Sequence, residues 1–134
     1  MKRVAVLGGG PAGAFAAELL VSAGLKTIVL DEKLAWEKPC GGGLTYKAYH
    51  QYPFLIENDT PKKLVMESSL AAPGAGETCL KLSHPLLIYS RMDLNRMLLE
   101  RAAKAGAEVE RHEHSDHLVL RSVEPRGRHP RSGR

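Results

Sequence analysis

The stretch that decides the fold is RVAVLGGGPAGAFAAELLVSAGLKTIVLDEK, residues 3–33. It opens with a continuous apolar run, residues 4–7, which is typical of a parallel strand buried on both faces. A glycine-rich turn at residues 8–13 follows at once and leads into a helix predicted for residues 11–23. A second apolar run, residues 27–30, predicts a second buried strand. This order of strand, turn, helix and strand is that of a dinucleotide-binding βαβ unit.

The turn, GGGPAG, has the glycine spacing that a pyrophosphate requires. Gly8 permits the tight turn, Gly10 lets the backbone approach the pyrophosphate, and Gly13 lets the helix pack closely on the sheet. Pro11 suits the first helical turn, where its missing N–H is no loss. The remaining N–H groups of that turn, around Ala12, and the positive end of the helix dipole would face the phosphates. We therefore predict that these five residues bind the ADP part of a dinucleotide.

An acidic residue closes the second strand. Asp31 stands eighteen positions after Gly13, where a carboxylate is placed to accept hydrogen bonds from an adenosine ribose. Glu32 lies beside it and leaves the choice of acceptor open. A purely structural glycine turn is the alternative interpretation, but the preceding strand, the following helix and the acidic strand end all favour a nucleotide.

Two helices are predicted from apolar spacing. The first should end at Gly24 and bury the small and apolar residues that recur at helical spacing, namely Ala12, Phe15, Ala16, Leu19 and Leu20. The second should begin after Ser90 as N-cap and end at Gly106. Its apolar positions, four residues apart, are Leu94, Leu98 and Ala102. Residues 107–111 then read as a further strand, parallel to the first two. We expect the first strand to lie between the other two, or at least beside the second.

Composition describes an ordinary globular protein of 134 residues, with 43% hydrophobic and 25% charged residues. The net charge of +4 comes from residues 125–134, PRGRHPRSGR, which hold four arginines and no acid. The rest of the chain is neutral, and no aromatic platform accompanies the basic tail, so we predict no nucleic-acid partner. We expect residues 1–124 to form one domain and the tail to be disordered.

Cellular location follows from what the sequence does not contain. Cys40 and Cys79 are too few for a disulfide framework. There is no signal peptide and no apolar run long enough to cross a bilayer. We therefore expect a cytoplasmic protein with reduced cysteines.

Two glycine-containing segments follow the nucleotide unit. Residues 38–45, KPCGGGLT, form a predicted loop whose backbone could lie against a flat ligand, although a flexible surface loop explains the glycines equally well. Residues 62–83 predict a β-hairpin, because two strand-like runs flank the turn APGAG. Cys79 in this hairpin is expected to be a half-buried strand residue without a redox role.

The combination of GGGPAG, an acidic strand end and KPCGGGLT resembles the geranylgeranyl reductase family of FAD-dependent oxidoreductases, over roughly residues 3–110. The resemblance implies that the first motif holds the ADP part of FAD. It implies that Cys40, Gly41 and Gly42 lie at the flavin ring and that Arg91 contacts the cofactor. The family commonly has Glu where this chain has Asp31, a shorter carboxylate that can still reach the ribose.

The resemblance also implies a function, the reduction of carbon–carbon double bonds in an isoprenoid or another apolar substrate. Cys40 is the catalytic-zone candidate, and it could equally be a small packing residue. The electron donor is unidentified, and a peripheral membrane contact of the full-length protein is left open. The alternatives are an aromatic hydroxylase-like flavin monooxygenase and a catalytically silent fragment that binds ADP or FAD.

The C-terminal part departs from the family. His112, His114 and His117 could be drawn as a metal cluster, but no distant ligands complete a site and we predict no metal. The Gly-Asp motif expected of a complete family member does not occur, so we expect a truncated fragment or a reading-frame slip between residues 111 and 124. The predicted fold is a Rossmann-like, three-layer α/β domain with a parallel sheet and an inserted β-hairpin, incomplete at its C-terminus.

Overall fold

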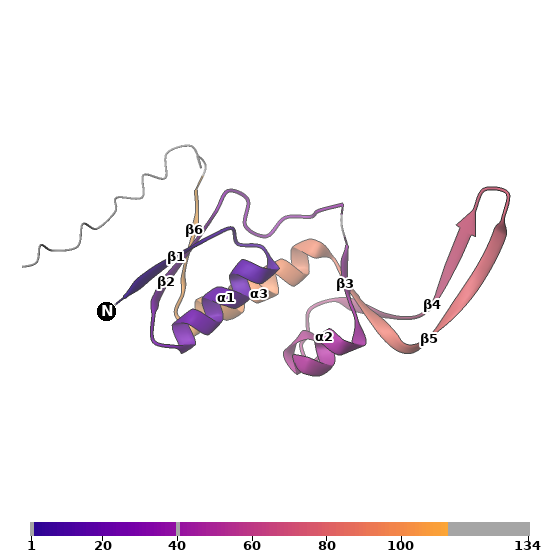
Figure 1. The fold of residues 1–134 in the computed structure, drawn as a ribbon. Coiled ribbons are helices and arrows are strands. Elements are labelled where there is room, and N and C mark those ends of the chain that lie inside the picture. The colour runs from indigo at the N-terminus through magenta and orange to yellow at the C-terminus, as the bar shows by residue number, and fades with distance from the viewer. Residues whose placement is uncertain (1, 40, 113–134) are drawn as a thin grey trace, which may run out of the picture.

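The structure is a computed structural model that describes residues 2–39 and 41–112. Its elements form two sheets joined by helices (Figure 1). In chain order they are β1 (Arg3–Leu7), α1 (Pro11–Ser22), β2 (Lys26–Asp31), β3 (Gly42–Leu44), α2 (Tyr46–Gln51), the 3-10 helix η1 (Pro53–Leu55), β4 (Lys62–Ala72), β5 (Gly76–Tyr89), α3 (Arg91–Ala105) and β6 (Glu108–Arg111).

The first sheet is parallel, as predicted, and has the strand order β1-β2-β6. Val29 of β2 pairs with Val6 on one side and with Val109 on the other. The prediction that β1 lies beside β2 is confirmed, but the preferred arrangement with β1 in the centre is wrong. The reason is the path of α3, which packs against α1 and returns the chain to the outer side of β2.

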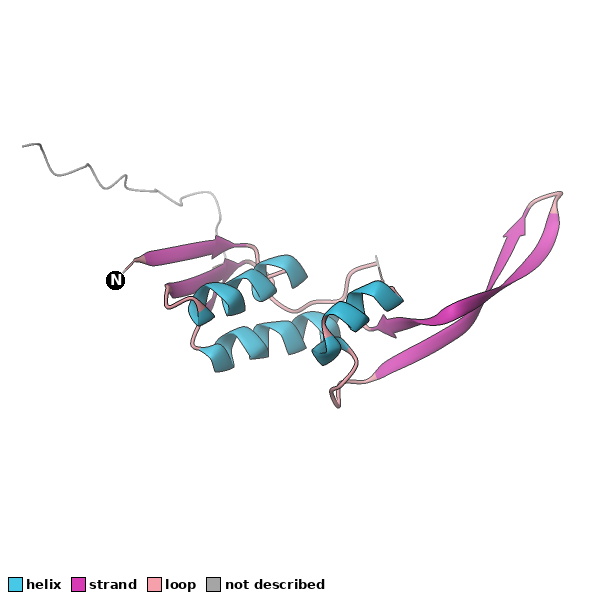
Figure 2. Ribbon diagram, turned by 60° about the horizontal axis from the view of Figure 1, so that its bottom comes forward, coloured by secondary structure: helices cyan, strands magenta, loops and turns pink. Residues whose placement is uncertain are grey.

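Helices α1 and α3 both lie over one face of this sheet (Figure 2). Thr27 and Val29 point into that covered face and are buried. On the opposite face no helix covers the strands within residues 2–39 and 41–112, and Leu7 is 61% exposed. The prediction that β1 is buried on both faces is therefore not met by the described residues, in which half-buried and exposed positions alternate along the strand.

The buried face of α1 differs from the predicted one. Ala14 and Ala17 are fully buried, whereas Ala12, Ala16 and Leu19 are exposed. Small side chains on the buried face allow α3 to approach closely. The two helices are also joined by an ion pair, in which Arg101 Nη2 lies 2.5 Å from Glu18 Oε1.

Helix α3 follows the sequence prediction closely. The Ser90 side chain accepts a hydrogen bond from the Asp93 N–H, and Gly106 ends the helix with φ +112°. The predicted apolar positions of the helix are all buried: Leu94, Leu98 and Ala102.

The second sheet is antiparallel, with the order β3-β5-β4. The predicted hairpin is confirmed, and Gly74 and Gly76 have the positive φ angles that its turn requires. Strand β5 extends beyond the predicted residue 83 to Tyr89. Pro85 is accommodated because strand pairing is irregular between residues 81 and 86, where a missing N–H costs no ladder hydrogen bond.

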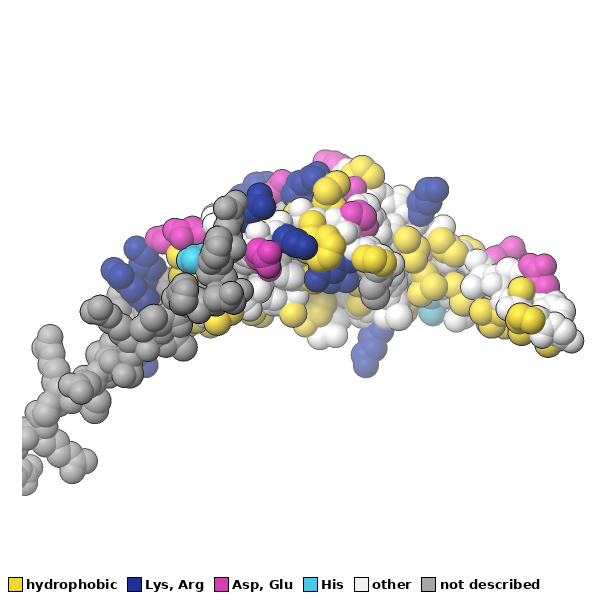
Figure 3. Space-filling view, turned by 90° about the horizontal axis from the view of Figure 1, so that it is seen from above, with side chains coloured by type: hydrophobic (Ala, Val, Ile, Leu, Met, Phe, Trp, Pro, Cys, Tyr) yellow, Lys and Arg dark blue, Asp and Glu magenta, His cyan; other side chains and the backbone are white. Residues whose placement is uncertain are grey.

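The β4–β5 hairpin projects away from the helices (Figure 1). Apolar side chains gather on its surface (Figure 3). About half of each of four side chains is exposed: Leu64, Met66, Leu70 and Leu80. Cys79 is exposed as well, which corrects the prediction of a half-buried residue. The hairpin is a two-stranded ribbon over this part, so it has no second layer of described residues to bury the thiol.

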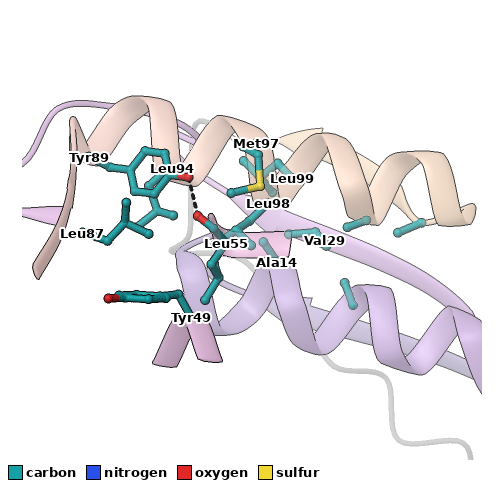
Figure 4. Packing of buried hydrophobic residues seen from close by; sticks show 13 residues of the cluster. Ala14, Val29, Tyr49, Leu55, Leu87, Tyr89, Leu94, Met97, Leu98 and Leu99 are labelled. Carbon is teal, nitrogen blue, oxygen red and sulfur yellow. Dashed lines mark hydrogen bonds between the residues drawn. The ribbon is translucent and has the colours of Figure 1, made fainter. Parts of the chain in front are cut away.

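The core lies where the two sheets meet α3 (Figure 4). Leu87 is fully buried, and Tyr89 is 3% exposed. The Tyr89 hydroxyl donates a hydrogen bond to the Leu55 carbonyl and accepts one from the Asn58 side chain at 2.8 Å. The base of the hairpin is therefore fixed to the 3-10 helix, whereas its tip makes no such hydrogen bond to another described element.

Two predictions fall partly outside the described residues. The domain limit at residue 124 and the tail at 125–134 lie beyond residue 112, so both stay predictions. In the part of the chain that is described, no helix is both long and apolar enough to span a bilayer.

The glycine turn provides a matched pair of stability tests. A Cβ on Gly13 would lie 1.9 Å from the Gly8 carbonyl oxygen, whereas one on Gly10 would meet no protein atom within 4 Å. Gly13→Ala should therefore lower the unfolding free energy by at least about 2 kcal/mol, because the helix must move off the turn. Gly10→Ala should lower it by less than about 1 kcal/mol, the cost of a poorer N-cap.

Urea unfolding of both variants measures the difference. Equal losses in the two variants would contradict the close approach of α1 to the turn.

Candidate functional site

The turn between β1 and α1 has the geometry that its glycines predict. Gly8 has φ +98°, and its N–H donates to the Leu30 carbonyl at 2.8 Å. Gly13 lies against the Gly8 carbonyl and the Val6 side chain. The chain's own packing therefore requires glycine at both positions, and a ligand is not needed to explain them.

The middle residue of the turn, Gly9, is held at both of its polar groups. Its N–H donates to Asp31 Oδ2 at 2.6 Å, and its carbonyl accepts from Asn95 Nδ2 at 2.9 Å. The Asn95 amide also donates to the Leu34 carbonyl at 3.2 Å. Asn95 is 5% exposed, and its Oδ1 is buried without a hydrogen-bond partner among the described residues.

Sequence reasoning missed Asn95. The signal was present, because a polar residue directly after Leu94 interrupts the buried stripe of α3. A buried polar group normally has a partner, so such an interruption indicates a specific contact. The pattern does not show which backbone groups that contact would reach.

Asp31 organises the backbone around the turn. In addition to Gly9, it accepts hydrogen bonds at Oδ1 from the N–H groups of Lys33 at 2.8 Å and Leu34 at 2.9 Å. Partial burial alone would raise the pKa of Asp31, but these backbone hydrogen bonds and the charge of Lys38 outweigh it and hold the pKa below its ordinary value. The carboxylate therefore stays ionised in the folded protein at neutral pH.

Asp31 can still make the predicted hydrogen bond to a ribose. Oδ2 accepts one hydrogen bond from the described residues and, as a carboxylate oxygen, can accept another from a hydroxyl group. The neighbouring Glu32 is exposed and does not line the hollow described next. The geometry thus favours Asp31 over Glu32 as the ribose acceptor.

A hollow opens between the starts of α1 and α3, and we call it the glycine-turn hollow. It is lined by Gly10, Pro11, Asp31, Leu34, Trp36, Lys38, Arg91 and Asn95. Its volume is about 20 Å³, which is room for about one water molecule. Four of the predicted cofactor-binding residues meet here: Gly10, Pro11, Asp31 and Arg91.

Gly10 is a glycine of the turn that the packing of the described residues does not require. Its φ of −66° and ψ of 178° are open to any residue, and no protein atom lies within 4 Å of where its Cβ would be. The fold itself therefore does not require glycine at this position. A Cβ would instead occupy space at the first turn of α1, where helix geometry leaves N–H groups without an intrahelical acceptor.

A carboxylate fixes the loop after β2 to the start of α3. The Ser90 hydroxyl donates to Glu37 Oε2 at 2.5 Å, and the N–H groups of Arg91 and Met92 donate to the same carboxylate at 3.0 and 3.3 Å. The Ser90 hydrogen bond is the largest cause of a lowered pKa of Glu37. Residues 33–38 are thereby tied down on the side facing Arg91.

The predicted flavin end is separate from this hollow. Gly42 belongs to β3, and its Cβ would lie 2.7 Å from the Tyr89 carbonyl oxygen, so close strand pairing requires the glycine. The predicted loop of three glycines is thus partly a strand. Gly41 has open space where its Cβ would lie. Cys40 lies outside the described residues.

The remaining predicted site residues either do not line the hollow or lie outside the described residues. Four predicted cofactor residues near the turn do not line the hollow: Gly8, Ala12, Gly13 and Glu32. No group of three metal-ligating side chains occurs in the described ranges. His114 and His117 lie outside those ranges.

Comparison with known proteins agrees with this geometry. Residues 1–47 match the family described as FAD binding domain. The chain is 38% identical over 110 residues to geranylgeranyl diphosphate reductase of Synechocystis, a match that covers 80% of the chain and 27% of that protein. It is 37% identical to the chloroplastic enzyme of Arabidopsis thaliana, with 80% and 23% covered. The chain thus spans about a quarter of the length of these relatives.

Solved structures give the same fold. A geranylgeranyl bacteriochlorophyll reductase-like protein of Thermoplasma acidophilum is 28% identical, with a TM-score of 0.65 over 81% of the chain and 30% of that protein. A flavin-dependent brominase is 19% identical, with a TM-score of 0.64 over 79% and 28%, which supports the fold alone. The chain therefore carries an FAD-binding, Rossmann-type α/β domain that is similar to part of the geranylgeranyl diphosphate reductases, as the sequence predicted.

Proposed function

We propose that the chain is the FAD-binding part of an oxidoreductase that reduces carbon–carbon double bonds of an isoprenoid substrate. The observation that supports the FAD-binding role most directly is the free space at Gly10, a residue that lines the glycine-turn hollow and that the fold does not require to be glycine. The first turn of α1 would bind the diphosphate through its N–H groups. Asp31 would accept a hydrogen bond from the ribose, and Arg91 would contact the phosphates.

The substrate follows from the relatives, which are named geranylgeranyl diphosphate reductases. When FAD is bound, it supplies the hydride for such a reduction. The role of the described residues is to hold and orient its ADP part. Gly41, Gly42 and Cys40 remain proposed for the flavin end, with Cys40 as the catalytic-zone candidate. We propose a cytoplasmic location, and we leave the electron donor unassigned.

ADP or FAD binding without turnover is the second candidate for the 134-residue chain alone. It is favoured by the share of the relatives that the chain spans, about a quarter. Flavin content of the purified chain, followed by an assay for reduction of an isoprenoid diphosphate, separates the two. Bound flavin with turnover supports the enzyme, and bound nucleotide without turnover supports the silent domain.

Gly10→Val should abolish ADP binding while the domain still folds. The added side chain has no protein atom to strike and would project into the space proposed for the diphosphate. Calorimetric titration of ADP into both proteins measures the loss, and circular dichroism checks the fold. The same affinity in wild type and variant would defeat the proposed nucleotide site.

Asp31→Asn should lower the unfolding free energy at pH 6 by about 1–3 kcal/mol, because the amide cannot accept from all three backbone N–H groups. The pKa of Asp31 is lowered in the folded state, so its stabilisation is complete above the ordinary carboxyl pKa of about 4 and is lost as the pH falls through the folded-state value. The difference between wild type and variant should therefore shrink from pH 6 to pH 3. A difference that does not depend on pH, measured by urea unfolding, would contradict the assigned role of the carboxylate.

A further inference from the structure

Lys38 is a cation at the glycine-turn hollow that the sequence analysis did not single out. It lines the hollow together with Arg91 and with Gly10. Its charge also contributes to the lowered pKa of Asp31, so it lies close enough to act on the anionic groups of this site. Two cationic side chains, one from the loop after β2 and one from α3, therefore border the same hollow.

The Lys38 side chain lies against the ring of Trp36. The Lys38 ammonium is 5.1 Å from the centre of the Trp36 ring, within the range of a cation–π contact. The ring is 37% exposed and also lines the hollow. An exposed lysine normally samples many rotamers, and such a contact restricts it to the neighbourhood of the ring.

Lys33 provides a natural comparison within the same loop. Its ammonium lies 4.7 Å from the centre of the Trp36 ring, so it makes the same kind of contact and has the same charge. It does not line the hollow. The two lysines therefore share their charge and their contact with Trp36 but differ in their access to the site.

The two nearby acids are held by other donors and do not pair with Lys38 among the described residues. The Asp31 carboxylate accepts hydrogen bonds from three backbone N–H groups, and the Glu37 carboxylate accepts from Ser90 and from the first N–H groups of α3. The ammonium of Lys38 forms no ion pair within 4 Å among the described residues. It thus remains able to bind an added anion.

We propose that Lys38, held against Trp36, is a second cationic contact for the diphosphate of the nucleotide, in addition to Arg91. The assignment rests on the proposed nucleotide site and adds a specificity to it. One lysine ammonium offers three donors for phosphate oxygens. Nucleotides that carry a diphosphate are therefore favoured over those with a single phosphate.

The test compares ADP and AMP binding to wild type, Lys38→Gln and Lys33→Gln at one salt concentration, by calorimetry. Lys38→Gln should raise the Kd for ADP about 10-fold, the loss of one charge-assisted contact. It should also reduce the preference for ADP over AMP. Lys33→Gln should change either Kd by less than about 2-fold, and Lys38→Arg should keep most of the ADP affinity.

Trp36 supplies an independent readout, because it is the one tryptophan of the sequence. ADP binding to wild type should change its fluorescence, because the phosphates would bind the ammonium group that lies over the ring, and this change should be much smaller in Lys38→Gln at saturating ADP. Trp36→Leu, measured by calorimetry, should weaken ADP binding by a smaller factor than Lys38→Gln, because the lysine is kept but no longer positioned.

The outcomes separate this proposal from the one on which it rests. ADP binding to wild type with equal Kd increases in the two glutamine variants, or with none in either, overturns the role of Lys38 and leaves the nucleotide site intact. No ADP binding to wild type overturns both. A selective loss in Lys38→Gln that Lys38→Arg restores supports the assignment.

Discussion

The site depends on how one peptide unit is held. Gly9 donates its N–H to Asp31 and accepts from Asn95 with its carbonyl, so the turn after β1 is joined to the end of β2 and to the N-terminal part of α3. Each partner reaches further, because both also bind the backbone at Leu34. Three segments that are distant in sequence therefore meet at one point. A turn held in this way presents the start of α1 without having to rearrange when an anion binds.

The local part of this arrangement could be predicted from the sequence, and the long-range part could not. The βαβ unit follows from an apolar run, a glycine turn and helical spacing, which act between neighbouring residues. The place of β6 beside β2 depends on α3 packing against α1, and no local pattern encodes that contact. The same limit explains Asn95, whose partners lie 61 and 86 residues away in the chain.

Burial was the least predictable property for a related reason. Leu7 is an apolar residue of a predicted buried strand, but it is 61% exposed. Cys79 was expected to be half-buried, but it is exposed. Each lies on a surface that no other described element covers. Residue type and alternation define which face of a strand is apolar, whereas burial also requires a second layer against that face.

The glycines show how structural and ligand-related reasons for one residue type can be separated. Gly8 is required by a positive φ, and Gly13 and Gly42 by backbone oxygens that lie 1.9 and 2.7 Å from where a Cβ would be. Gly10 has an ordinary φ and open space where a Cβ would lie. A motif match gives the same weight to all of these positions. The structure assigns three of them to the fold and leaves Gly10 without a structural requirement, beside the hollow that Arg91 and Lys38 also line.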